Sequence, residues 1–287
     1  MNVNLPEEHK IKKRDLIIYI SVALVCVISL MIAFYVQFYA RVNLVGIFGI
    51  NTNEEFGSKS EEQKELLKSE FDELFTNSVD NDESKNIDKK ADKNKNLVYI
   101  CYEKKENKAN SYDIDVKVPH ININNDIGHK FNKEIEDIFV TKAENILKSE
   151  NKNVIYTVEF VANVEEDILS LMIRSNLKEG SSAQRVIIQT YNYDLRNNKE
   201  VTLEEALRIK EVDKQLVQGE IDEEIKLEQK KVEDLKKLGY TIYNRNTSSD
   251  IYKIEKTTEF YLTKNTLYII YAYGNESFTS EMDVIII

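Results

Sequence analysis

The chain of 287 residues is poor in the residue types on which covalent, metal and phosphate chemistry usually depend. It has two cysteines, three histidines, eight glycines, two prolines and no tryptophan. Cys26 lies within an apolar run and Cys101 stands alone beyond it, so the region after that run must fold without an internal disulfide. The sequence has no CxxC pair, no GxGxxG loop and no GxSxG elbow. These absences exclude a zinc site built on CxxC pairs and leave no sign of a dinucleotide site or a hydrolase nucleophile.

The remaining candidates for chemistry are few. His120 and His129 stand on either side of Asp126, which makes a metal site of two histidines and one carboxylate conceivable. Two ordinary surface histidines in a loop fit the absence of HxxxH and HExxH spacing better. Cys101 lies in a run that predicts a strand, where a packed small residue is expected rather than a nucleophile. Carboxylates fall mostly on solvated helix faces, so no glycosidase pair can be named. We expect no catalytic residue, no metal and no cofactor.

The charge of the chain limits its partners. The formal net charge is -11 at pH 7. A surface this acidic does not suit nucleic acid, so we expect no nucleic-acid partner. It also disfavours general adhesion to anionic lipid head groups.

A long apolar run, Leu16 to Tyr35, contains no charged residue. About 20 helical residues span the roughly 30 Å hydrocarbon core of a bilayer. Only Arg41 follows the run closely, whereas four basic residues precede it, namely Lys10, Lys12, Lys13 and Arg14. The positive-inside rule therefore predicts a cytoplasmic N-terminus and an extracytoplasmic C-terminal region.

Two other interpretations of this run fit the sequence less well. A cleaved signal peptide would have a shorter apolar core and a small-x-small site, but the best site, Phe38-Tyr39-Ala40, carries a bulky phenylalanine. A buried core helix of a soluble protein would rarely be so long and so free of charge. The run therefore predicts an uncleaved signal-anchor that places the protein in the cell membrane with a single pass.

The sequence predicts four segments. They are a cytoplasmic stub (1–15), a transmembrane helix (16–40), a juxtamembrane stretch (41–96) and an extracytoplasmic α+β domain (97–287). Within the third segment, apolar residues from Ser58 to Phe75 recur at helical spacing and predict an amphipathic helix. That helix could pack on the outer domain or on a partner copy. Residues 76–96 are strongly polar and predict a linker.

Strand and helix patterns follow one another from residue 97 onward. Strands are expected at 97–102, 112–118, 154–164, 168–176, 185–194, 259–262, 266–273 and 282–287. Pro119 is expected to end the second of them. Helices are expected from Asp126 to about Ser149, after the cap Thr202, and from about Glu211 to Leu238. The predicted fold is α+β, with an antiparallel sheet packed by two helices and preceded by one transmembrane helix.

Tyrosine is abundant, with sixteen residues, several of them in the groups YNYD and YIIYAYG. Exposed tyrosines suit the recognition of sugars or proteins, so Tyr191, Tyr193, Tyr271 and Tyr273 are candidate binding residues. The alternative is that tyrosine simply suits half-buried strands.

Several stretches resemble a known family. The stretch SYDIDVKVPHININND, followed by FNKEIE at Phe131 to Glu136, resembles the start of the outer domain of RsiV-type anti-sigma factors, whose relatives also occur beside peptidoglycan deacetylase domains. Asp167 to Gly180 and Val186 to Leu207 are similar to that family's central hairpin and the helix after it. The end, FYLTKNTLYIIYAYGNESFTSEMDVIII, resembles its closing hairpin. The resemblance covers most of residues 97–287 and consists of strand and turn residues rather than a catalytic signature.

The resemblance implies a wall-facing α+β domain with a sensory or binding role. In the best-known members this domain binds lysozyme, and binding triggers intramembrane release of a sigma factor. Only residues 1–15 precede the apolar run here, too few for a helical clamp on a sigma factor, so that role is not expected of them.

The predicted function is that of a non-enzymatic, membrane-anchored extracytoplasmic binding or sensing protein of the bacterial cell envelope. Its ligand is expected to be a cell-wall component or an extracellular protein, such as a lysozyme-like protein. Two alternatives stay open: an anti-sigma-like transmembrane regulator with a truncated inner segment, and a wall-polymer hydrolase.

Overall fold

The computed structural model describes residues 69–80, 90–150, 153–165, 167–182, 184–240, 246–273 and 281–286. All of these residues belong to one unit of the chain, which begins at Phe56. The predicted stub (1–15), the predicted anchor (16–40) and residues 41–68 lie outside the described residues. No helix within the described ranges has the length and apolar character needed to cross a membrane.

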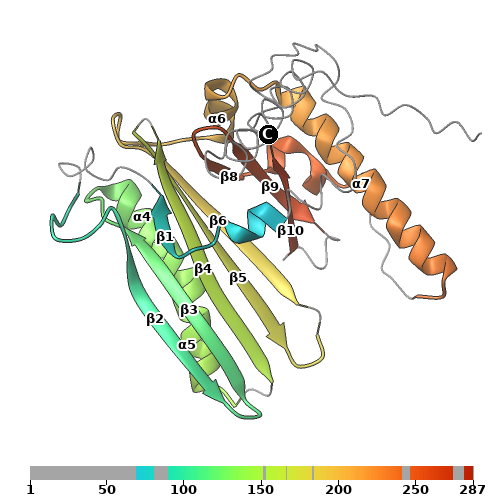
Figure 1. Ribbon diagram of the computed structural model, residues 1–287, viewed down its shortest axis with the longest axis horizontal. Helices are drawn as coiled ribbons and strands as arrows, with labels where there is room; N and C mark the ends of the chain where they lie inside the picture. Colours follow the sequence, from blue (N-terminus) through green and yellow to red (C-terminus); the bar gives the residue numbers. More distant parts are fainter. Residues whose placement is uncertain are drawn as a thin grey trace, which may run out of the picture. The chain divides into compact units, whose positions relative to one another are not determined.

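The larger of two sheets has seven strands (Figure 1). Six follow in the order β2-β3-β4-β5-β6-β7, and β1 pairs with β4. The strands are β1 (Ser78–Asp80), β2 (Val98–Lys108), β3 (Tyr112–Ile121), β4 (Val154–Glu165), β5 (Ile168–Glu179), β6 (Arg185–Asp194) and β7 (Lys199–Glu200). The antiparallel meander predicted for residues 154–194 is confirmed, because β4 pairs with β5 and β5 with β6 in antiparallel fashion.

A helical connection makes part of this sheet parallel. Between β3 and β4 the chain forms α4 (Asp126–Ile135), the π-helix η2 (Glu136–Val140) and α5 (Thr141–Lys148). Because these helices carry the chain back along the sheet, β4 runs in the same direction as β3 and pairs with it in parallel. β1 also pairs with β4 in parallel, beyond the residues that β3 reaches. The predicted sheet is therefore antiparallel in most of its pairs, but parallel at β3–β4 and at β1–β4.

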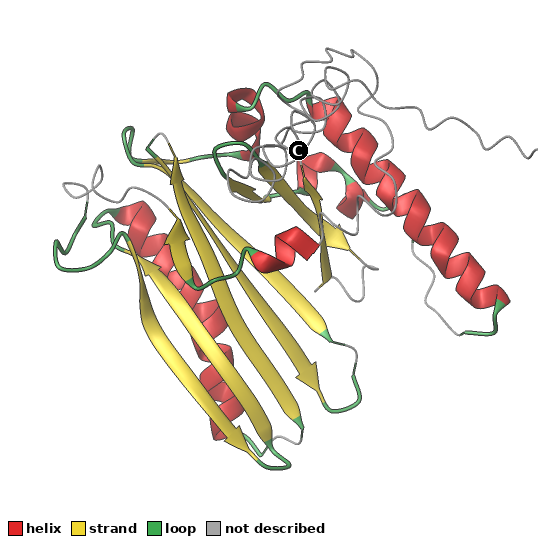
Figure 2. Cartoon of the chain, in the orientation of Figure 1, coloured by secondary structure: helices red, strands yellow, loops and turns green. Residues whose placement is uncertain are grey.

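The same helices cover one face of the large sheet and close the main core (Figure 2). Their buried side chains recur at helical spacing, namely Phe131, Ile135, Phe139, Ala143 and Ile146. They pack on inward-facing strand residues such as Val116, Val158 and Ile173. The helix predicted from Asp126 to Ser149 is thus present, interrupted only by the π-helical turn.

A second, smaller sheet was not separated from the first by the sequence pattern. It is antiparallel, in the order β10-β9-β8, and its strands are β8 (Glu259–Leu262), β9 (Leu267–Tyr273) and β10 (Glu281–Ile286). One face carries Phe260 and Ile269 into a core shared with α6 (Leu203–Ile209), α7 (Lys214–Lys237), η3 (Asp250–Tyr252) and η4 (Ile254–Lys256). The other face carries Tyr261 and Ile270 toward the large sheet.

The ends of α6 and α7 follow their sequence signals. Thr202 and Glu205 form the predicted capping box at the start of α6. Asp213 caps α7, accepting a hydrogen bond from the backbone N–H of Gln215. Gly239 follows α7 with a φ of +91°, a left-handed conformation that suits the residue after a helix.

Residues 69–80 belong to the folded unit. Residues 69–73 are helical, and the side chains of Phe71 and Phe75 are 5% and 8% exposed. Both lie in a third buried cluster together with Val161, Met172, Ile188, Tyr261 and Ile270. The amphipathic helix predicted over 58–75 therefore packs, in its described part, on its own domain. Strand β1 stands where the polar composition predicted the first residues of a linker.

Three strands extend at least three residues beyond their predicted ends, and one of them is β5, which reaches Glu179. β3 continues past Pro119 to Ile121, because β2 carries a bulge between Ile100 and Tyr102 opposite that proline. β2 also continues to Lys108, although its last six residues are charged or polar. β2 is an edge strand of the large sheet, and exposed charged side chains are typical of such strands.

Candidate functional site

A row of polar side chains joins the small sheet to one face of the large sheet. The row consists of Asn163, Ser170, Thr190 and Asn192, and we call it the polar row. Ser170, Thr190 and Asn192 are only 0%, 9% and 4% exposed. All four side chains bond to the backbone of β8. Polar residues at these otherwise apolar strand positions therefore serve the contact between the sheets.

The hydrogen bonds of the polar row serve the backbone of Phe260 and Leu262. The Phe260 N–H donates to Thr190 Oγ1 at 3.1 Å, and Asn192 Nδ2 donates to the Phe260 carbonyl at 2.9 Å. The Leu262 N–H donates to Ser170 Oγ at 3.3 Å, and its carbonyl accepts from Asn163 Nδ2 at 3.2 Å. The buried edge of β8 that does not face β9 is thereby satisfied. This arrangement sets where β8, and with it β9 and β10, cross the large sheet.

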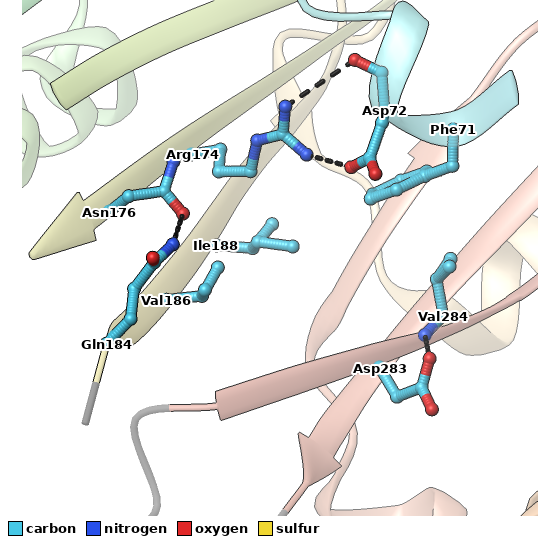
Figure 3. A pocket seen from close by; sticks show the side chains of 9 residues that line it. All are labelled: Phe71, Asp72, Arg174, Asn176, Gln184, Val186, Ile188, Asp283 and Val284. Atoms are coloured by element: carbon cyan, nitrogen blue, oxygen red, sulfur yellow. Dashed lines mark hydrogen bonds and ion pairs between the residues drawn. The ribbon is translucent and has the colours of Figure 1, made fainter. Parts of the chain in front are cut away.

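Further along β5 and β6, the space between the two sheets opens into a cleft of about 320 Å³ (Figure 3). Its apolar lining consists of Phe71, Val186, Ile188 and Val284. Its polar lining consists of Asp72, Arg174, Asn176, Gln184 and Asp283. The lining thus comes from four places in the chain: the helical residues 69–73, β5, β6 with the residue before it, and β10. We refer to this space as the cleft.

Arg174 is the best-fixed polar group of the cleft. Its guanidinium bonds to Glu159 Oε1 at 2.8 Å and forms a second ion pair with the carboxylate of Asp72 (Figure 3). It also lies 4.0 Å from the ring centre of Phe75, a cation–π contact. The side chain is only 14% exposed. A guanidinium held from three sides in this way is pre-organised and keeps one geometry.

The other polar groups at the cleft are partly paired with one another. Gln184 Nε2 donates to Asn176 Oδ1 at 3.2 Å, and the Val284 N–H donates to Asp283 Oδ1 at 2.8 Å (Figure 3). Two carboxylates and one guanidinium line the cleft, with the carboxylate of Glu159 behind the guanidinium. The polar part of the cleft lining is therefore acidic on balance.

Comparison with known proteins gives structural neighbours only. No family model and no curated protein matches the chain. The chain is similar to a solved DUF3298 family protein from Pseudomonas aeruginosa PAO1, at 14% identity over 66% of this chain and 85% of that one, with a TM-score of 0.35. It is similar also to a DUF3298 family member from Bacteroides fragilis NCTC 9343, at 12% identity over 61% and 81%, with a TM-score of 0.34. Its structural neighbours are thus DUF3298 family proteins, and the RsiV-type resemblance stays a prediction.

Tyr191 and Tyr193, two of the predicted binding residues, are core residues. They are 2% and 1% exposed. Tyr191 packs against Phe131 of α4 with ring centres 4.9 Å apart and the ring planes tilted by 57°. The Tyr193 hydroxyl accepts a hydrogen bond at 2.6 Å from Asn125, the residue that caps α4. These tyrosines fix the helical layer to the sheet, so they do not form an exposed binding patch.

The second predicted pair lies on β9. Tyr271 is 1% exposed and belongs to the core beneath α7. The side chain of Tyr273 lies outside the described residues. A binding role for Tyr271 would require an exposed side chain, but strand β9 is central in the small sheet and carries that face inward. The alternative interpretation, that tyrosine suits buried strand positions, fits the three tyrosines whose side chains are described.

His120 and His129 are held by different partners. His120 Nε2 lies 2.9 Å from Glu136 Oε1, and burial lowers the pKa of His120 despite that carboxylate. His129 Nε2 lies 3.1 Å from Asn124 Oδ1. Among the described residues, no group of three or more histidine, cysteine or carboxylate side chains could hold a metal ion. His120 and His129 are therefore not brought together with Asp126.

Cys101 lies at the bulge of β2 and is exposed, not packed as predicted. Its thiol donates to the carbonyl of Val118 at 3.3 Å. Loss of solvation beside β3, followed by the charge of Glu136, raises the pKa of Cys101 to about 11. A thiol with so high a pKa carries almost no thiolate at neutral pH and is a poor nucleophile.

Arg174, Asn176 and the polar row were missed at the sequence level. The available signal was the presence of single polar residues inside apolar strands, as in ILSLMIRSN and VIIQTYNYD. In an alternating strand, such residues indicate either an exposed face or a buried polar contact. Only the position of the second sheet distinguishes the two.

Glu259 is the carboxylate that ends the polar row. Its Oε2 accepts hydrogen bonds from the backbone N–H and the hydroxyl of Thr190, and its Oε1 accepts from Gln189 and Thr258. Loss of solvation outweighs these four donors and raises the pKa of Glu259. A group whose pKa is raised on folding favours the folded state at low pH, and that contribution is lost as the pH rises through the folded-state pKa.

We therefore predict that Glu259→Gln becomes more stable relative to the parent protein as the pH rises from about 4 to about 7. Glutamine keeps an acceptor for Thr190 and carries no charge to desolvate. The measurement is urea unfolding of both proteins across this range. Glu255→Gln is the matched control. It should become less stable relative to the parent protein as the pH rises, because an exposed ion pair with Lys214 lowers the pKa of Glu255. A Glu259→Gln difference that stays constant with pH would contradict the prediction.

Proposed function

We propose that this protein is a membrane-anchored, extracytoplasmic binding or sensing protein of the bacterial cell envelope, and that its ligand enters the cleft. The proposed role is non-enzymatic. The observation that carries it is the cleft itself, an opening between two sheets that is lined by both apolar and polar side chains.

The size and lining of the cleft favour one anchoring side chain of a protein ligand. Small-molecule pockets usually occupy about 300–1,000 Å³, and this cleft lies at the lower end of that range. Protein interfaces commonly centre on an apolar or aromatic anchor that fills such a pocket, with polar groups around it. Val186, Ile188 and Val284 provide apolar contacts for an anchor, while Asn176 and Gln184 offer amide groups to the ligand backbone.

The charge of the cleft favours a cationic ligand. The net charge of the chain is -11, and carboxylates outnumber the single guanidinium around the cleft. Opposite charge on a partner raises the rate of encounter and orients it. The RsiV-type resemblance suggests a lysozyme-like protein as such a partner. The apolar run at 16–40 is the support for a single-pass anchor with the domain outside the membrane.

The test is calorimetric titration of the full chain, in detergent, with lysozyme and with soluble peptidoglycan fragments. Residues 69–80 must be present, because Phe71 and Asp72 line the cleft. We expect Val186→Lys to weaken binding at least about tenfold, or about 1.4 kcal/mol, because a cation replaces an apolar contact and repels a cationic ligand.

Ile100→Lys is the matched control. Ile100 is an exposed apolar residue on the edge strand β2 and does not line the cleft. We expect it to bind as the parent protein does. Equal loss of binding in both variants would argue against the cleft, and no binding of lysozyme or of any wall fragment by the parent protein would overturn the proposed function. Turnover of wall polymer by the purified chain would favour the hydrolase alternative instead.

A further inference from the structure

Helix α7 is longer than the core that it covers. At about 1.5 Å per residue its 24 residues measure about 36 Å. Its buried residues are Val217, Ile221, Glu224 and Ile225, all in the first half. No residue of α7 beyond Ile225 is buried, and Figure 1 shows this half running away from the strands of the small sheet.

The far end of α7 exposes large apolar side chains. Leu235 is 40% exposed, Leu238 is 75% exposed and Tyr240 is 62% exposed. Exposure of this extent is unusual for three large apolar or aromatic residues within six positions of a soluble surface helix. We call residues 226–240 the α7 tip.

The charge of the helix changes sign along its length. Residues 214–225 carry one lysine and four carboxylates, a net charge of -3. The α7 tip carries five lysines against three carboxylates, a net charge of +2, on a chain of net charge -11. Lys231 pairs with Glu228, whose side chain is 16% exposed, and Lys237 pairs with Asp234. Both Lys237 and Asp234 are exposed, and exposed pairs of this kind are weak.

The helix dipole accounts for part of this pattern. Cations are favoured in the last turn of a helix, which explains Lys236 and Lys237. It does not explain the lysines at 226, 230 and 231, which lie earlier, and it does not explain the exposed Leu238 and Tyr240. The combination of lysines with exposed leucine and tyrosine is typical of a segment that lies in a membrane interface.

We propose that the α7 tip makes a peripheral contact with an anionic lipid surface. A bilayer surface offers negative head groups to the lysines and an apolar phase to Leu238 and Tyr240. A soluble polyanion would meet only the first need. A second copy of the tip would bring like charges together. The acidic charge of the whole chain still opposes general adhesion, so the contact is confined to this one end.

The contact goes beyond ligand binding in the cleft. It rests on the proposed function in one respect only, namely that the proposed membrane anchor would hold the domain near a bilayer. Its test therefore reports the position of the α7 tip and does not depend on lysozyme or wall fragments.

The chain contains no tryptophan, so Tyr240→Trp adds a single tryptophan reporter at an exposed position. The full chain is incorporated into vesicles of phosphatidylcholine, alone or mixed with phosphatidylglycerol, with bromine on the acyl chains in each case. Flotation confirms that the protein is vesicle-bound in both. We expect an approximately twofold loss of tryptophan emission with phosphatidylglycerol and little loss without it, because the indole enters the interface only when the lysines are attracted.

Two comparisons make the outcome specific. A variant that combines Tyr240→Trp with glutamine at four lysines should show no loss of emission. The four changes are Lys230→Gln, Lys231→Gln, Lys236→Gln and Lys237→Gln. Ile100→Trp, an exposed reporter on β2, should show none in either vesicle. Equal emission in both vesicles would overturn the proposal. A blue shift that depends on protein concentration in detergent alone would overturn it in favour of a second copy.

Discussion

Replacing Phe71 with alanine is expected to lower the free energy of unfolding by about 3–5 kcal/mol. The ring is 5% exposed and meets Phe75 edge-on, with ring centres 5.6 Å apart, and Tyr268 at 5.7 Å. Removing it leaves a cavity where the two sheets and residues 69–73 meet. Urea unfolding of the full chain, followed by far-ultraviolet circular dichroism, measures the change.

Asp72→Ala in the same helical turn is the control for this prediction. The carboxylate of Asp72 is 66% exposed, so the loss of its ion pair with Arg174 should cost at most about 1 kcal/mol. If Phe71→Ala lowered the free energy of unfolding by less than Asp72→Ala does, residues 69–80 would not pack on the domain in solution. In that case the cleft would lose one wall, and the proposed binding site with it.

The second large effect is expected at Asn192. Changing it to aspartate places a carboxylate oxygen against the carbonyl of Phe260, where the amide now donates at 2.9 Å. The site is 4% exposed, so the charge has little solvent and no described cation beside it. We expect a loss of about 3 kcal/mol in unfolding free energy at neutral pH.

This loss should shrink as the pH falls. A protonated carboxyl can donate to the Phe260 carbonyl while still accepting from the Ser170 hydroxyl, which lies 2.6 Å from Asn192 Oδ1. The pKa of the introduced group is raised on folding, so the variant recovers stability below that pKa. Unfolding titrations near pH 7 and near pH 4 measure the recovery. Asn145→Asp, at an exposed position on α5, should change stability by less than about 0.5 kcal/mol at both values. A loss at Asn192 that does not depend on pH would argue against the polar row.

Local signals predicted the elements well and their pairing less well. Period-two and helical patterns located the strands of residues 154–194, both of the longer helices and the capping box at Thr202. Because the connections between β4 and β5 and between β5 and β6 are short, each reverses the chain and gives an antiparallel pair. The charged second half of β2 and the three-residue β1 were missed, because an edge strand is recognised by its neighbour rather than by its own composition.

The candidate site depends on contacts between residues far apart in sequence. Asp72 meets Arg174, and Thr190 meets Phe260. No periodicity within a short window reports such a contact. The buried tyrosines show the same limit, because Tyr191 and Tyr271 have the composition of exposed recognition residues and are covered only by layers formed elsewhere in the chain.

By itself, the sequence determined the alternation of strands and helices after residue 97, the helix caps, and an acidic chain that must fold without disulfides. It also predicts an anchor at 16–40 that lies outside the described residues. The tertiary structure alone decided that there are two sheets, that residues 69–80 join them, and that a cleft opens where they separate. The physical reason is that local conformation follows from neighbours in the chain, whereas burial follows from which distant surfaces cover one another.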